Sequence, residues 1–355
     1  MGIADDTIAV RAGEELDSTK IEAYLRAHLS GLGAGRLEVR QFPSGASNLT
    51  YLLRLGAWEG VLRRQPLGPV APKAHDMRRE AGLLARIHPV FPLAPRPYLF
   101  CDDLELMGVP FYIMERRTGF VFNDTFPPGV EGTPDLCRRI SEALVDTLVQ
   151  IHGLDWRAAG LSEFGHPEGF LERQVKSWIE RYARSQTGES PDVAELTRWL
   201  IEHIPTGPAP TLIHNDFKLN NMLMDITDLA RPVAVLDWEM TTIGDPLFDL
   251  AISLGYWVQP GDPAELRAIL PTITPLPGFY TRAEFMQRYA TRSGRDLSSM
   301  QFYLTFAYFK LAVILQQIYV RWKRGQTHDP RFAVFGSRTS ILVDLAARMT
   351  TRGSI

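Results

Sequence analysis

A short polar loop between two apolar segments has the residue types that chemistry on a phosphate would need. It begins at His214 and reads His-Asn-Asp-Phe-Lys-Leu-Asn-Asn, so Asp216, Lys218 and Asn221 lie close together in the chain. Phosphoryl transfer requires a carboxylate that orients the acceptor hydroxyl, oxygen ligands for Mg²⁺ and a cation near the phosphates. We expect Asp216 to accept the hydroxyl proton, Asn221 to bind the metal and Lys218 to face the γ-phosphate, with His214 supporting the loop.

A second acidic residue follows the next apolar segment. Residues 233–236 are Val-Ala-Val-Leu, and the sequence Asp-Trp-Glu begins directly afterwards at Asp237. A carboxylate at the end of a strand, near a loop that carries Asp and Asn, suits a further Mg²⁺ ligand. The alternative is that Asp216, Asn221 and Asp237 only cap turns or a helix, but capping does not explain their order along the chain. The sequence therefore predicts Asn221 and Asp237 as metal ligands.

Together with Gly-Asp-Pro-Leu-Phe-Asp-Leu-Ala at residues 244–251, this loop resembles the aminoglycoside phosphotransferase family. That family comprises small-molecule phosphotransferases with a protein-kinase-like fold, and the chain is closest to the branch that occurs fused to acyl-CoA dehydrogenases. The resemblance extends from Phe42 to about Gly325. It implies that Asp216 is the catalytic base, that Mg²⁺ is bound and that the phosphate donor is ATP or another nucleoside triphosphate.

The chain departs from the family pattern at two places. Asn215 stands where the family usually has Gly, and Asp-Trp-Glu at residues 237–239 replaces the Asp-Phe-Gly of protein kinases. The second departure is common among small-molecule members. The resemblance also implies that the region around Asp249 buttresses the catalytic loop, so we expect a structural role for Asp249. Asp245 is expected to cap a helix.

The nucleotide-binding residues are less distinctive. Ser47 lies in a loop, Ser-Gly-Ala-Ser-Asn, whose backbone N–H groups could cover phosphates, although an ordinary hairpin turn would look the same. Val61 and Arg63 share one face of a predicted strand, which suits an apolar contact to adenine and a cation at the α- and β-phosphates. The family places a basic residue in this strand, and Arg64 is the rival to Arg63.

Two further nucleotide contacts come from the resemblance alone. Glu80 resembles the acid that pairs with the basic residue of the strand, although a solvated helix residue is the alternative. Residues 111–115 resemble the hinge strand, which implies that the backbone of Met114 to Arg116 contacts the edge of adenine.

The pattern of elements indicates two lobes. Strands are predicted at residues 37–42, 50–55, 60–64 and 109–115. A helix with Met77, Ala81 and Leu84 on one face follows the third of them, and helical spacing dominates after Gly119. We expect an α+β, protein-kinase-like fold with a helical extension at 1–35, a β-rich nucleotide-binding lobe at 36–116 and a larger, mainly helical lobe at 117–355.

Composition limits the classes of partner and compartment. With a net charge of −3 the chain has no basic field for nucleic acid. Cys101 and Cys137 are far apart and the amino terminus has no apolar signal region, which favours a reducing cytoplasm. The apolar stretch Phe302–Val320 contains Lys310 and two glutamines and is short for a bilayer, so we expect a buried core helix and no membrane contact.

The acceptor site is the least explicit feature. Lys310, Gln317 and Arg321 are offset by seven and four residues, which places them on one face of a helix. They could bind an anionic or hydroxylated acceptor, or form a solvent-facing stripe. We expect a hydroxyacyl compound or another carboxylate-bearing alcohol ahead of an aminoglycoside, because a polycation needs a strongly acidic pocket.

The expected function is thus an ATP-dependent small-molecule O-phosphotransferase. The rival from another class is a nucleotide-binding pseudokinase that regulates a partner, but Asp216, Lys218, Asn221 and Asp237 are all present, which speaks against it. A protein kinase is not supported, since no Ala-Pro-Glu motif follows Asp237. The oligomeric state is left open.

Overall fold

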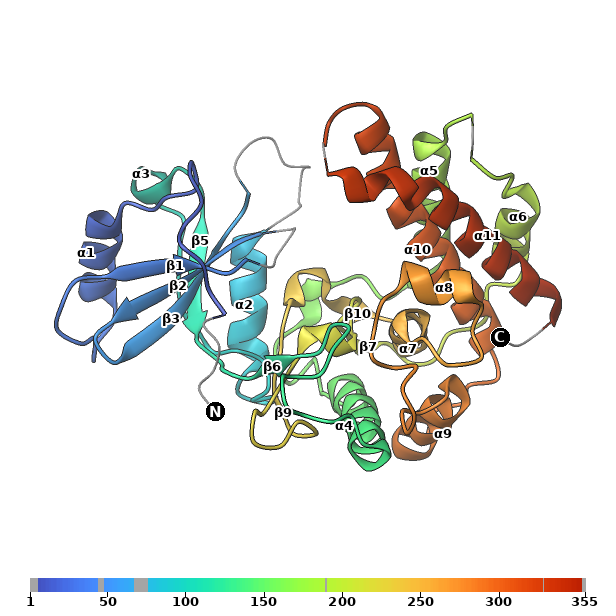
Figure 1. The fold of residues 1–355 in the computed structure, drawn as a ribbon, viewed down its shortest axis with the longest axis horizontal. Coiled ribbons are helices and arrows are strands. Elements are labelled where there is room, and N and C mark those ends of the chain that lie inside the picture. The colour runs from blue at the N-terminus through green and yellow to red at the C-terminus, as the bar shows by residue number, and fades with distance from the viewer. Residues whose placement is uncertain (1–5, 44–47, 67–75, 189, 328, 353–355) are drawn as a thin grey trace. The chain divides into compact units, whose positions relative to one another are not determined.

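The computed structural model describes residues 6–43, 48–66, 76–188, 190–327 and 329–352. The chain forms two compact units (Figure 1). Unit 1 comprises Met1–Gly119 and Val233–Glu239, and unit 2 comprises Phe120–Pro232 and Met240–Ile355.

Unit 1 is built on a five-stranded antiparallel sheet with the order β1-β2-β3-β5-β4. Its strands are β1 (Glu38–Gln41), β2 (Leu49–Leu55), β3 (Trp58–Arg64), β4 (Pro97–Cys101) and β5 (Phe111–Glu115). The helices of this unit are α1 (Ser18–His28), α2 (Met77–Ile87) and the short α3 (Leu104–Met107). The strand order brings β3 and β5, which are distant in sequence, together at the centre of the sheet.

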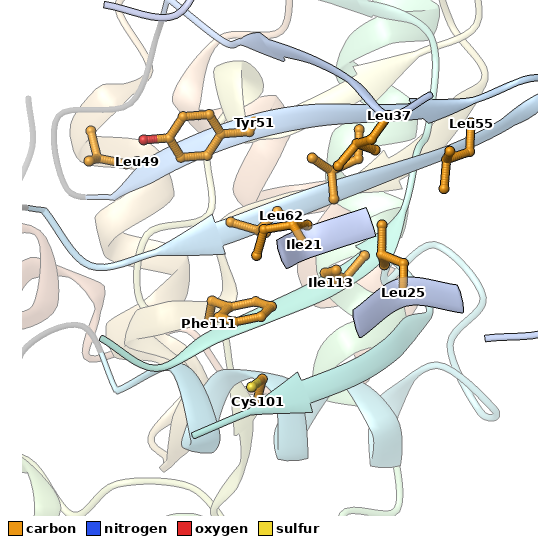
Figure 2. Close-up of a cluster of buried hydrophobic side chains, with 11 residues drawn as sticks. Ile21, Leu25, Leu37, Leu49, Tyr51, Leu55, Leu62, Cys101, Phe111 and Ile113 are labelled. Atoms are coloured by element: carbon orange, nitrogen blue, oxygen red, sulfur yellow. The ribbon is translucent and has the colours of Figure 1, made fainter. Parts of the chain in front are cut away.

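The apolar core of unit 1 fills the space between α1 and one face of the sheet (Figure 2). Ile21 and Leu25 of α1 are fully buried against Leu53, Leu62 and Ile113 of the sheet. Asp17 caps α1 by accepting a hydrogen bond from the backbone N–H of Lys20. The sheet face that carries even-numbered residues of β3 is therefore the α1 face, and Arg63 points to the opposite face.

Helix α2 begins at an aspartate cap and packs on β4 and β5. Asp76 accepts a hydrogen bond from the backbone N–H of Arg79 at 2.9 Å. Its buried side includes Met77, Glu80 and Leu84, so a glutamate lies among the apolar residues of this face.

Unit 2 is mainly helical. Its helices are α4 (Pro134–His152), α5 (Phe170–Ser185), α6 (Ala194–Glu202), α7 (Pro246–Tyr256), α8 (Ala264–Ile269), α9 (Arg282–Ser293), α10 (Met300–Lys323) and α11 (Phe335–Arg352). Short strands interrupt them: β6 (Phe120–Val121) pairs with β8 (Met222–Met224), and β7 (Thr211–Ile213) with β10 (Thr242–Gly244), both antiparallel. Strand β9 (Pro232–Val235) leads the chain back into unit 1. Within the described part of the chain, the 3-10 helices are η1 (Ser162–Phe164), η2 (Leu219–Asn221), η3 (Trp238–Met240) and η4 (Pro330–Val334).

The longest helix, α10, forms the centre of unit 2 and contacts α5, α7 and α11. It is the one helix of the described residues that is long and apolar enough to cross a membrane, and 72% of that apolar window is buried within the protein. Such burial is what we expect of a core helix.

The domain ranges expected from sequence differ from these units in three respects. The predicted boundary at residue 116 lies three residues before the end of the first segment of unit 1 at Gly119. Residues Val233–Glu239 group with unit 1, whereas the sequence pattern assigns them to the helical lobe. Helix α1 also belongs to unit 1 and packs on its sheet.

Candidate active site

Strand β7 leads directly into the polar loop of unit 2 that the sequence predicts to be catalytic, and we call residues 214–221 the catalytic loop. Leu212 and Ile213 are completely buried, and Met222 and Met224 of β8 are buried on its other side. Apolar strands thus fix both ends of a segment whose centre carries polar side chains.

Within this loop, Asp216 is held by two side chains. Lys218 Nζ donates hydrogen bonds to both carboxylate oxygens, at 2.9 and 2.7 Å. Asn221 Nδ2 donates to Asp216 Oδ2 at 3.1 Å and to the Asp216 carbonyl at 2.9 Å. Because the amide nitrogen of Asn221 faces Asp216, its oxygen points elsewhere and is the atom suited to bind a metal. The structure therefore brings the three predicted loop residues together.

A buried carboxylate, Asp249 of α7, anchors this loop. Its oxygens accept the backbone N–H groups of His214 and Asn215, both at 2.7 Å, and His152 Nε2 lies 3.1 Å away. Burial acts to raise the pKa of Asp249, but hydrogen bonds and charge from His152 and His214 leave it below its usual value. The expected structural role of Asp249 is confirmed by these contacts. Asp245 caps α7 through the backbone N–H of Leu247, as expected.

Asn215 adopts a left-handed backbone conformation with φ of 68°. Gly reaches this region without strain and Asn is among the residues that tolerate it best, so Asn can stand where the family usually has Gly. Its amide Nδ2 donates to the Met240 carbonyl at 3.3 Å. The substitution thus adds side-chain contacts and leaves the turn possible.

The three residues predicted on the α10 face have different surroundings. Lys310 is only 6% exposed, and its Nζ donates a hydrogen bond to Asn215 Oδ1 at 3.1 Å. Gln317 is half-buried and Arg321 is exposed. Only Lys310 is connected to the catalytic loop by these contacts, and the role of the three residues in acceptor binding stays a prediction.

In unit 1, three carboxylates surround the side chain of Arg63. Arg63 Nη1 contacts Glu80 Oε1 at 2.6 Å, which confirms the predicted pairing, and its Nη2 lies 3.3 Å from Asp237 Oδ1 and 4.0 Å from Glu239 Oε2. Burial works to lower the pKa of Arg63, but Glu80, Tyr112, Asp237 and Glu239 raise it well above its usual value, so it stays charged. Burial raises the pKa of Glu80, and Arg63 opposes that rise.

The rival cation Arg64 points to the other side of the sheet. Its Nη2 donates to the Tyr51 hydroxyl at 2.8 Å and to the Glu14 carbonyl at 3.0 Å. Arg63 is therefore the cation of β3 that accompanies Glu80 and Asp237.

The other predicted nucleotide residues lie on or near the same sheet. Val61 is buried and pairs with Met114 in the ladder between β3 and β5. Arg116 follows β5, forms an ion pair with Asp6 at 2.7 Å and lies over the ring of Phe42. Ser47 lies outside the described residues. Contact of these residues with a nucleotide stays a prediction.

The residues expected to hold Mg²⁺ have suitable chemistry. Asn221 offers an amide oxygen in unit 2, and Asp237 offers a carboxylate in unit 1, both hard oxygen donors. In unit 1 the carboxylates of Glu80, Asp237 and Glu239 surround a single guanidinium, and this excess of negative charge favours a cation. Among the described residues no group of three or more His, Cys, Asp or Glu could hold a metal by itself.

Sequence reasoning missed three side chains of these clusters. Tyr112 is paired with Arg63 in the strand ladder, and Asn48 Nδ2 donates to Glu239 Oε2 at 2.8 Å. Lys218 Nζ lies 4.7 Å from the centre of the Tyr256 ring at the end of α7. Strand alternation could have indicated Tyr112 once β3 and β5 were paired. Asn48 ends the predicted Ser-Gly-Ala-Ser-Asn loop, for which only backbone contacts were expected, and Tyr256 has no local signal.

The fold and these two clusters define a phosphotransferase of the protein-kinase-like class. The sequence profile of the Phosphotransferase enzyme family matches residues 38–299, and the chain belongs to this family. Acyl-CoA dehydrogenase family member 11 of Rattus norvegicus is 36% identical over 360 residues, which include 99% of this chain. Acyl-CoA dehydrogenase family member 10 of Mus musculus is 32% identical over 98% of the chain. The matches cover 45% and 32% of those relatives, so the chain spans less than half their length.

Solved structures agree on the fold. A candidate aminoglycoside phosphotransferase from Ralstonia eutropha has a TM-score of 0.82 at 29% identity, over 95% of this chain and 99% of that one. A thermostable aminoglycoside phosphotransferase mutant in complex with AMP-PNP and hygromycin B has a TM-score of 0.60 at 17% identity, over 95% of this chain and 100% of that one. Choline kinase from Cryptosporidium parvum has a TM-score of 0.59 at 13% identity, over 94% of this chain and 95% of that one. The expected family, fold class and phosphotransferase class are confirmed.

Proposed function

We propose that this chain is an ATP-dependent, Mg²⁺-dependent O-phosphotransferase that transfers the γ-phosphate to a hydroxyl group of a small molecule. The observation that carries the proposal is the Asp216 carboxylate, which Lys218 and Asn221 hold on a loop anchored by buried Asp249. A fixed carboxylate can orient the acceptor hydroxyl and take its proton as the oxygen attacks phosphorus. Retention of all these groups speaks against a pseudokinase.

The remaining residues would act on the nucleotide. Bound Mg²⁺ would neutralise charge on the phosphates, with Asn221 and Asp237 as its protein ligands. Arg63, kept charged by its carboxylate neighbours, would contact the α- and β-phosphates. Its planar guanidinium can donate paired hydrogen bonds to phosphate oxygens. Lys218 would balance the charge that develops on the transferred group. One of the similar solved structures contains AMP-PNP, which supports a nucleotide as the phosphate donor.

A hydroxyacyl compound or another carboxylate-bearing alcohol is our preferred acceptor, ahead of an aminoglycoside-like compound. The support is the name of the relatives, acyl-CoA dehydrogenase family members 10 and 11. We also propose a cytoplasmic location, which the free, buried Cys101 and Cys137 would suit.

The test is ADP release with Mg²⁺ and ATP across a panel of hydroxylated acids, alcohols and aminoglycosides. Asp216→Asn should lower kcat by roughly 10²–10⁴-fold while nucleotide binding is retained. The matched control is Asp225→Asn, because Asp225 accepts hydrogen bonds from Thr227 in a turn beyond β8. An Asp216→Asn protein that phosphorylates an acceptor at close to the wild-type rate would refute the assignment.

A further inference from the structure

A pocket of about 390 Å³ opens in unit 2 beside the catalytic loop, and Lys218 is part of its lining. Lys218 Nζ lies 2.7 Å from Asp216 Oδ2, so a lining residue of the pocket forms an ion pair with the proposed base. Tyr256 lines the pocket next to Lys218. A molecule in the pocket could therefore present an atom to Asp216.

Part of the lining of the pocket is apolar. Leu144 of α4, Leu219 of the catalytic loop, Trp257 after α7 and Ile269 of α8 line it, and all four are buried. Leu270, which follows Ile269, continues the apolar wall and is partly exposed. Such a surface favours a carbon skeleton, because binding removes apolar area of both the ligand and the protein from contact with water.

Few charges face this pocket. Among the described residues that line it, Asp124 is the one carboxylate and Lys218 the one cation, and Lys218 is already paired with Asp216. The exposed Asn123 and Asn220 add neutral polar groups. A polycationic acceptor would need several carboxylates in its site, so the lining favours a ligand with little or no positive charge.

We propose that this pocket binds the phosphate acceptor, and that the acceptor is an alcohol with an apolar carbon chain, a class that includes hydroxyacyl compounds. The inference rests on the proposed function and names its substrate class. The hydroxyl lies beside Lys218 and Asp216, and the carbon chain packs on Leu144, Trp257 and Ile269. The hydroxyl oxygen forms a bond to the γ-phosphorus as the bond to the bridging β,γ-oxygen breaks. ADP keeps that electron pair, and the hydroxyl proton passes to Asp216.

This pocket differs from the α10 face. Lys310, Gln317 and Arg321 are not among its lining residues, so substitutions in the two places separate the two possibilities. Leu270→Glu introduces a carboxylate at a partly exposed position of the lining, where the fold can accommodate it. The matched control is Leu276→Glu, because Leu276 is 42% exposed in the same segment and is not part of the lining.

The experiment measures ADP release by the full chain with ethanol, butanol, hexanol and octanol as acceptors. We expect kcat/KM to rise by about fourfold for each added methylene until the pocket is filled. Leu270→Glu should lower kcat/KM for hexanol about tenfold or more, with the KM for ATP unchanged, since an apolar contact to the bound alcohol is replaced by a charge. Leu276→Glu should behave as the wild type. Equal responses of the two variants, or a preference for kanamycin over every alcohol, would overturn the inference.

Calorimetry separates this inference from the proposed function. Alcohols are titrated into the Asp216→Asn protein, where binding does not depend on turnover. Affinity that rises with chain length and is lost in Leu270→Glu supports the pocket, even if no phosphate is transferred and the proposed function fails. If ATP is bound and consumed but alcohol affinity does not depend on chain length, the pocket assignment is wrong and the proposed function stands.

Discussion

Lys310 Nζ donates a hydrogen bond to Asn215 Oδ1 at 3.1 Å and so connects the middle of α10 to the catalytic loop. Asn215 occupies the left-handed position where the family usually has Gly, which has no side chain to accept such a bond. The ammonium also lies over the rings of Phe248 and Trp178, at 5.0 and 5.4 Å from their centres. The departure from Gly thus comes with a buried cation directly behind the loop that carries Asp216.

This buried lysine predicts a specific dependence of stability on pH. Burial lowers the pKa of Lys310 from 10.5 to about 8, with Asp216 and Asp249 opposing the shift and Arg181 and Lys218 adding to it. Between these two values the unfolded chain keeps a proton that the folded protein has released, so the free energy of unfolding rises with pH. Relative to Lys310→Met, the wild type should gain on the order of 3 kcal/mol between pH ~7 and pH ~10.5.

Urea denaturation of both proteins at several pH values within that window measures the difference. Lys323→Met is the control, because Lys323 is exposed at the end of the same helix. Parallel stability profiles for the wild type and Lys310→Met would contradict the prediction.

Asp249→Asn should weaken both the fold and catalysis. The substitution removes the charge that accepts the N–H groups of His214 and Asn215, and turns part of the group into a donor. We expect a loss of about 2–4 kcal/mol in the free energy of unfolding, as for other buried charged hydrogen-bond acceptors. Because the loop carries Asp216, kcat should fall while the KM for ATP changes little.

Denaturation and steady-state kinetics on one preparation test this. The control is Asp228→Asn, which breaks an exposed ion pair with Arg139 and should cost less than about 1 kcal/mol. A variant that loses stability but keeps the wild-type kcat would mean that Asp249 does not position the loop.

Local signals predicted much of this fold. Asp17 and the pair Thr133-Pro134 begin α1 and α4, as their preference for helix starts predicts. Strand β4 was missed because it lies in a Pro-rich segment. Helix α5 was missed because it starts after Gly169 without a side-chain cap. Both elements were therefore missed because their local sequence carries no clear signal for them.

The site was predictable where its residues are neighbours in the chain. Asp216, Lys218 and Asn221 were found together because the loop is short. The contact between Lys310 and Asn215 joins residues 95 positions apart and depends on how α10 packs. The choice between Arg63 and Arg64 likewise depended on which face of the sheet α2 covers. Packing between distant segments decides these contacts, and no single segment specifies it.

Substitution of Arg63 and Arg64 should separate nucleotide binding from stability. Arg63 faces Glu80 and Asp237, so we expect Arg63→Met to raise the KM for ATP about tenfold or more, in line with the loss of a charged hydrogen bond. Arg64 bonds Tyr51 and the Glu14 carbonyl, so Arg64→Met should lower the melting temperature with little change in that KM. Each variant is the control for the other. Equal KM values for both would remove the special role given to Arg63.

Asp237 and Glu239 should differ in their importance for metal binding. Asp237 and Glu239 are two residues apart and both lie near Arg63, at 3.3 and 4.0 Å, but they differ in their other contacts. Glu239 Oε2 also accepts a hydrogen bond from Asn48 Nδ2 at 2.8 Å, which ties it to β2. Asp237 has a left-handed backbone with φ of 65°, a conformation that Asn tolerates. Asp237→Asn therefore removes a charge and keeps the turn, and Glu239→Gln is the matched substitution.

We expect Asp237→Asn to weaken Mg²⁺-dependent binding of AMP-PNP about tenfold or more, because even indirect partners of a bound metal contribute that much to its affinity. Glu239→Gln should stay within about twofold of the wild type, since its amide oxygen can still accept from Asn48. Calorimetric titrations with and without Mg²⁺ measure both effects. In the absence of the metal, Asp237→Asn should bind AMP-PNP at least as well as the wild type, because a repulsive charge near the phosphates is gone. Equal losses in the two variants, or a loss for Asp237→Asn that does not depend on Mg²⁺, would show that Asp237 does not act through the metal.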